Sequence, residues 1–132
     1  MQSTIGATCI ALLFALTARA FAGDSKALFE KNVRPLLERK CYDCHSAKAD
    51  EVKGNLRLDS LEGILKGGDN GPAVIAGDVE NSFLLRAIRY QEDDYQMPPS
   101  GRLPDGDIAA VETWVKALEQ KSNRPGVRIA NP

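Results

Sequence analysis

Cys41, Cys44 and His45 stand in a Cys-x-x-Cys-His motif, the pattern that attaches a c-type haem. Two cysteines three positions apart, followed directly by a histidine, fit on about one helical turn and can present two thiols and an imidazole to one flat ligand. In that geometry the thiols form thioethers with the haem vinyl groups and the imidazole ligates the iron. The motif therefore predicts one covalently bound haem c, held by Cys41 and Cys44, with His45 as a metal ligand.

Met97 is the candidate for the sixth iron ligand. A haem iron that shuttles electrons usually takes a methionine or a second histidine in that position. His45 is the only histidine in the chain, and Met97 is the only methionine besides Met1. Pro98 favours an extended backbone at Met97, and Pro98-Pro99 stiffens a loop that could hold a weak thioether ligand. The alternative, that Met97 fills a gap in the core, fits a proline-flanked polar loop less well.

Three other interpretations of the motif are a zinc site, a thioredoxin-like dithiol and a structural disulfide. A closed zinc site needs about four cysteine or histidine ligands, and beyond the motif the chain expected after export offers none. A thioredoxin-like motif lies near a strand-helix-strand pattern, whereas these flanks predict a helix and a loop. A Cys41–Cys44 disulfide stays open for a chain into which no haem is loaded.

The N-terminus has the pattern of a secretory signal peptide. Residues 5–18 form an uncharged, mostly apolar run, and residues 20–22 read Ala-Phe-Ala, so we expect cleavage after Ala22 and a signal peptide over 1–22. The run is shorter than the ~20 residues of a membrane span, although residues 1–4 carry no Lys or Arg and an uncleaved anchor remains the alternative. Cleavage would remove Cys9. We expect a periplasmic or otherwise exported protein with no stable membrane span after cleavage.

Apolar spacing predicts an all-α domain over residues 23–120. Helices are expected at 25–40, interrupted at Pro35, at 60–66, at 79–90 behind Gly77-Asp78, and from Pro104 onward. Trp114 is expected to pack against the first helix. The glycine-rich stretch 67–72 lacks the Lys-Ser/Thr ending of a phosphate-binding loop and is interpreted as a turn. Residues 121–132 lack periodicity and are interpreted as a flexible tail or a truncated linker.

The charged residues of the chain indicate which partners it could bind. A formal net charge of -1 over 132 residues argues against a nucleic-acid partner, and we expect a monomer. Arg86 and Arg89 could reach haem propionates, or simply form a solvated face. The run 92–94, Glu-Asp-Asp, could steer a basic redox partner toward the haem edge, or be no more than a solvated loop.

Several stretches around the motif occur together in one family. They are Phe29-Glu30-x-x-Val33-Arg34-Pro35-Leu36-Leu37, Leu56-Arg57-Leu58-Asp59-Ser60, Gly67-Gly68-Asp69-x-Gly71-Pro72-Ala73, Gly77-Asp78, Ser82-x-Leu84-Leu85-x-Ala87 and Gln96-Met97-Pro98-Pro99. Together they resemble the planctomycete-type cytochrome c domain over residues 28–118. The resemblance implies a class I-like helical cytochrome fold, with Cys41 and Cys44 as attachment sites and His45 and Met97 as axial ligands. Such domains often begin longer exported proteins, so we expect either a stand-alone carrier or a truncated relative.

These observations favour an exported monohaem c-type cytochrome that transfers single electrons to and from a redox partner protein of unknown identity. The sequence offers no general base, nucleophile or second metal site, so we do not expect an enzyme. One alternative is a haem-based ligand-binding or peroxidase-like protein from whose iron Met97 dissociates. The other is an electron-relay module for a larger exported enzyme.

Overall fold

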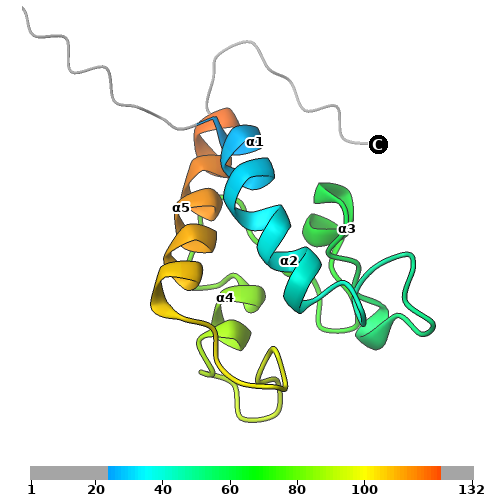
Figure 1. Cartoon of the computed structure of the whole chain (residues 1–132). Helices are drawn as coiled ribbons and strands as arrows, with labels where there is room; N and C mark the ends of the chain where they lie inside the picture. The colour runs from blue at the N-terminus through cyan, green and yellow to red at the C-terminus, as the bar shows by residue number, and fades with distance from the viewer. Residues whose placement is uncertain (1–23, 123–132) are drawn as a thin grey trace, which may run out of the picture.

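The computed structural model describes residues 24–122, which fold into helices joined by turns (Figure 1). Within this part of the chain there is no β-strand, only two isolated bridges, between Gly68 and Gly71 and between Ile75 and Asp78. The described residues thus agree with the predicted all-α class. The signal peptide predicted for residues 1–22 and nearly all of the predicted tail lie outside the described residues.

The helical elements follow one another in a simple order. They are α1 (Ser25–Leu28), the π-helical turn η1 (Phe29–Val33), α2 (Arg34–Lys40), the short 3-10 turn η2 (Lys53–Asn55), α3 (Leu61–Lys66), α4 (Phe83–Ile88) and α5 (Asp105–Ser122). Because α5 continues to Ser122, the predicted start of the tail at residue 121 falls two residues inside this helix. None of the helices in the described part combines the length and apolarity that a bilayer crossing requires.

The predicted first helix is present as three consecutive segments, α1, η1 and α2. In η1 the helix widens, so that the Arg34 N–H donates to the Phe29 carbonyl, five residues back. Pro35 occupies the first turn of α2, where a residue without an N–H is tolerated. The predicted interruption at Pro35 is therefore confirmed, and it takes the form of a change of helical pitch at the residue before the proline.

The long helix α5 packs along α1 and η1 (Figure 1). Its apolar side chains recur every three or four residues and are buried: Ile108, Val111, Trp114, Val115 and Leu118. The Trp114 ring lies 5.1 Å from the Phe29 ring between centroids, at an interplanar angle of 41°. The predicted contact of Trp114 with the first helix is confirmed, and it joins the two ends of the domain.

The helix predicted at 79–90 is wrong in its bounds, because α4 spans only Phe83–Ile88. The preceding residues form polar turns instead. Asp78 accepts hydrogen bonds from the backbone and side-chain amides of Asn81, at 3.0 and 2.7 Å, and the buried Ser82 hydroxyl donates to the Asp78 carbonyl at 2.6 Å. Such side-chain hydrogen bonds compete with helical ones. At the other end the helix stops because Tyr90 is left-handed, with φ 62°.

Candidate functional site

The Cys-x-x-Cys-His motif lies in a tight turn at the end of α2, as the flanking pattern predicted. The His45 N–H donates to the Cys41 carbonyl at 2.9 Å, so one helix-like turn carries both cysteines and the histidine. Cys41 caps α2 through a 2.8 Å bond from its N–H to the Leu37 carbonyl. Both thiols are free: Cys41 is half-buried and Cys44 is exposed.

A cavity of about 400 Å³ opens directly beside this turn. Its volume lies in the range of ~300–1,000 Å³ that is typical of small-molecule and cofactor sites. Cys41, Cys44, His45 and Met97 all line it, so the structure brings the four predicted site residues to one space. The rest of the lining is largely apolar, from Leu56, Leu58, Ala73, Phe83, Leu84, Ala87, Ile88, Tyr95, Pro98 and Pro99. This set of two thiols, one imidazole and one thioether fits a large, flat, apolar cofactor that is attached through the thiols and carries a metal.

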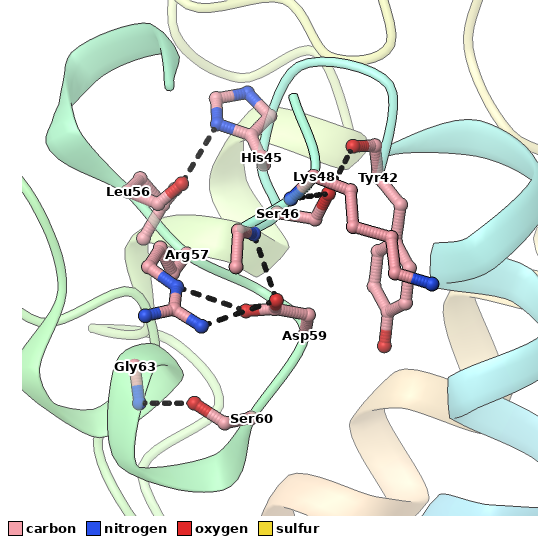
Figure 2. A network of polar contacts seen from close by, with 10 residues as sticks. Tyr42, His45, Ser46, Lys48, Leu56, Arg57, Asp59, Ser60 and Gly63 are labelled. Carbon is pink, nitrogen blue, oxygen red and sulfur yellow. Dashed lines mark hydrogen bonds and ion pairs between the residues drawn. The ribbon is translucent and has the colours of Figure 1, made fainter. Parts of the chain in front are cut away.

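The imidazole of His45 is held by a backbone carbonyl. Its Nδ1 lies 3.3 Å from the Leu56 oxygen (Figure 2). A carbonyl oxygen can only accept, so Nδ1 carries a proton, and in the neutral imidazole Nε2 then keeps its lone pair for a metal. Neutral imidazole with one nitrogen bonded to a carbonyl is the usual arrangement of a metal-binding histidine. The residues present therefore fit an iron ligand at His45.

The turn that carries the motif is tied to residues 53–58 by further backbone bonds. The Lys53 N–H donates to the Cys44 carbonyl at 2.9 Å, and the Leu58 N–H donates to the His45 carbonyl at 2.8 Å. Beyond the motif, the carboxylate of Asp59 accepts from the Ala47 N–H at 2.8 Å and pairs with Arg57 at 3.2 Å (Figure 2). These bonds hold the loop after His45 against the segment that supplies the Leu56 carbonyl.

The protonation chemistry of Cys41 differs from that of a redox dithiol. Burial raises the pKa of the Cys41 thiol to about 11, and the neighbouring Cys44 adds to the rise. In thioredoxin-like motifs the attacking thiol has a lowered pKa. Among residues 24–122 no group of three or more His, Cys, Asp and Glu side chains is placed to hold a metal ion.

Met97 reaches the cavity from a loop that begins beyond α4. Its N–H donates to the Ala87 carbonyl at 3.2 Å, and the next residue, Pro98, is buried and follows a cis peptide bond. The Tyr90 hydroxyl donates to the Pro98 carbonyl at 2.5 Å. One hydrogen bond to Ala87 in α4 and one from Tyr90 just beyond this helix thus hold the residues around Met97, which is itself half-buried.

The charged residues singled out in the sequence have other partners. Arg86 pairs with Glu92 at 2.6 Å, and Arg89 pairs with Glu112 at 2.7 Å. Neither arginine lines the cavity. Since Glu92 is engaged by Arg86, the predicted acidic run keeps Asp93 and Asp94 as its exposed carboxylates.

Three contributions at the site were not found from the sequence. The Leu56 carbonyl is a backbone group, and no residue type signals it. Gly68 was interpreted only as part of a turn, although it lines the cavity. Tyr90 and Pro98 are eight residues apart, and only the reversal of the chain after α4 brings them together. The left-handed conformation of Tyr90 is rare for a residue other than glycine, asparagine or aspartate, so the residue type gave no signal of it.

Comparison with known proteins agrees with the geometry. Residues 41–101 match the family model described as Planctomycete cytochrome C, a range that includes Cys41, Cys44, His45 and Met97. No curated protein and no solved structure matches the chain. A cytochrome c domain implies binding of haem c, and it suggests electron transfer based on that haem. The segment from Cys41 to Gly101 is thus a planctomycete cytochrome C domain.

Proposed function

We propose that this chain is an exported monohaem c-type cytochrome that transfers single electrons, with Cys41 and Cys44 as covalent attachment sites and His45 and Met97 as axial ligands. One observation carries the proposal: a single, largely apolar cavity is lined by all four residues, although Met97 lies far from the motif in the chain. When bound, haem c supplies an iron that cycles between the ferrous and ferric states.

The residues around the cavity have three tasks in this function. The thiols would fix the group at one edge, each by net addition of its S–H across a vinyl carbon-carbon double bond. The bond from His45 Nδ1 to the Leu56 carbonyl orients the imidazole and leaves Nε2 free. The apolar side chains exclude water, which lowers the local dielectric and reduces the reorganisation that accompanies a change of charge.

The proposal is tested by absorption spectra of protein matured with haem c, in both oxidation states, for the wild type, Met97→Ala and Met97→Leu. We expect a low-spin wild-type spectrum with a weak far-red sulfur-to-iron band. Both substitutions should abolish that band, because leucine keeps the approximate volume of methionine but has no thioether. A high-spin wild-type spectrum that neither substitution alters would overturn the assignment and favour the ligand-binding or peroxidase-like alternative. A change in Met97→Ala alone would mean that Met97 acts by packing.

A further inference from the structure

A second loop lies against the segment that supplies the Leu56 carbonyl. We call it the glycine loop (residues 67–71). The Asp69 N–H donates to the Gly54 carbonyl at 2.9 Å, and the Asn55 side-chain amide donates to the Asp69 carboxylate at 2.7 Å. The loop is closed on itself by two bonds between Gly68 and Gly71, at 3.2 and 3.0 Å. It therefore reaches residues 54–56 as a preformed turn.

Gly68 makes the closest approach in this contact. A Cβ atom added to Gly68 would lie 2.2 Å from the Gly54 oxygen and 3.0 Å from both the nitrogen and the Cβ of Leu56. The first distance is one that real Cβ atoms essentially never show, so a side chain here must displace the backbone of residues 54–56. Gly71 differs, because a Cβ there meets nothing within 4 Å and its glycine is explained by a φ of 83°. Glycine is thus required at position 68 by the close approach of this residue to Gly54 and Leu56.

The backbone of residues 54–56 is therefore held between two neighbours. The glycine loop contacts Gly54 and Leu56. The motif binds Leu56 of this segment through His45, and it binds the preceding residue, Lys53, through the Cys44 carbonyl. Whatever moves this segment moves the Leu56 oxygen relative to the imidazole.

We propose that Gly68 is a positioning residue for His45: by allowing the glycine loop to lie directly on residues 54–56, it fixes the Leu56 carbonyl at hydrogen-bonding distance from Nδ1. This inference rests on the proposed role of His45 as iron ligand. A hydrogen bond accepted from Nδ1–H makes the imidazole a stronger donor at Nε2. A stronger donor favours the ferric iron, so this contact lowers the reduction potential.

The test uses the full haem-loaded protein and three variants. Gly68→Ala forces the segment away. Asn55→Gly releases it, since it removes the amide bonded to Asp69 while glycine accepts the φ of 52° at this position. Asn55 does not line the cavity, so this variant leaves the cavity wall unchanged. Gly106→Ala is the matched control, because a Cβ there meets nothing within 4 Å.

Two readouts separate positioning from mere structure. The midpoint potential should rise in Gly68→Ala and in Asn55→Gly but not in Gly106→Ala. His45 is the only histidine, so its imidazole nitrogen signals are unique in an NMR spectrum of the reduced protein. Exchange of its Nδ1 proton with water should be faster in both variants by up to about tenfold, which corresponds to one hydrogen bond of ~1.4 kcal/mol.

A lower melting temperature with unchanged potential and unchanged proton exchange in both variants would overturn the proposal and leave Gly68 with a packing role. Should Gly68→Ala fail to fold, Asn55→Gly decides alone. A wild-type His45 with its proton on Nε2 would also overturn it. The Nδ1 proton can exchange with water whether or not Met97 binds the iron, so a protein that fails the Met97 test yet shows faster exchange in the variants refutes the proposed function and supports the positioning role.

Discussion

The Tyr90 hydroxyl donates a 2.5 Å hydrogen bond to the Pro98 carbonyl, so a side chain just beyond α4 fastens the loop that carries Met97. A thioether is a weak ligand, and its hold on an iron depends on the loop that presents it. Pro98 and Pro99 alone were predicted to stiffen this loop, whereas in the fold Tyr90 also holds it.

We expect Tyr90→Phe to loosen this loop without changing the cavity lining. Loss of one hydrogen bond of ~0.5–1.5 kcal/mol should let added imidazole displace Met97 about two- to tenfold more readily. Imidazole titration of the ferric protein, followed by loss of the far-red band, measures this. Tyr42→Phe is the control, since the Tyr42 hydroxyl has no hydrogen-bond partner among the described residues and Tyr42 does not line the cavity. Equal imidazole affinity in Tyr90→Phe and the wild type would contradict the role of Tyr90.

Asp59 should make the fold sensitive to acid. The bond from the Ala47 N–H, with the nearby Arg57 guanidinium, holds the pKa of the Asp59 carboxyl below its ordinary value of 3.8. The folded state thus binds its proton less readily than the unfolded state. The stabilisation is fully present above about pH 4 and is lost as the pH falls through the lowered value.

The measurement is urea unfolding of the wild type and Asp59→Asn at pH 5 and pH 3. The free energy of unfolding should fall less between these pH values in Asp59→Asn than in the wild type, because the substituted chain has lost that titration. Asp94→Asn, at an exposed position, should behave like the wild type. A wild-type pH dependence retained in Asp59→Asn would place the acid sensitivity elsewhere.

The Phe29–Trp114 contact should dominate the stability of the helical frame. Trp114 is 1% exposed, and truncation of such a side chain typically costs ~3–5 kcal/mol. We expect Trp114→Ala to lower the free energy of unfolding by about that amount while a folded sample keeps the wild-type absorption spectrum, because Trp114 does not line the cavity. Leu65→Ala, at a position 39% exposed, should cost much less. A comparable cost for both would show that α5 is not anchored by this ring.

Asp93 and Asp94 should influence the rate of electron exchange with charged reagents. We expect the double variant Asp93→Asn/Asp94→Asn to react more slowly with a cationic ruthenium hexaammine and faster with anionic ferricyanide, by less than about tenfold in each case. Both differences should vanish at high salt, since exposed charges are screened over about 10 Å at 0.1 M. Stopped-flow mixing at low and high ionic strength gives the rates. If the double variant and the wild type react at the same rate with each reagent, the acidic run has no steering role.

Residue type and local spacing were sufficient for part of this fold. The motif predicted Cys41, Cys44 and His45 as site residues, and elimination among histidines and methionines added Met97. The structure places all four at one cavity. The buried stripe of α5 also follows from local periodicity. So does its start near Pro104, which lies directly before Asp105 and whose carbonyl accepts the first bonds of the helix. Each of these depends on residues that are close in the chain or on a residue type that is nearly unique in it.

What could not be predicted depends on tertiary contacts. The start of α4 is delayed to Phe83 because Ser82 bonds backward to Asp78 and Ile75. Arg89 reaches Glu112, 23 residues away, which no local pattern signals. The His45 tautomer is set by a backbone oxygen eleven residues further on. In each case the partner is a group whose position only the folded chain defines.

Because the cavity brings the motif and Met97 together, a metal bound to both would restrict the unfolded chain. His45 and Met97 are about fifty residues apart, so one iron bound to both would act as a reversible cross-link that closes a long loop. By the chain-entropy estimate for a covalent bridge, a loop of this length is worth about 4 kcal/mol. If His45 and Met97 both ligate the iron as proposed, the ligand pair would stabilise the fold as well as serve electron transfer, and loss of the Met97 bond would open this loop.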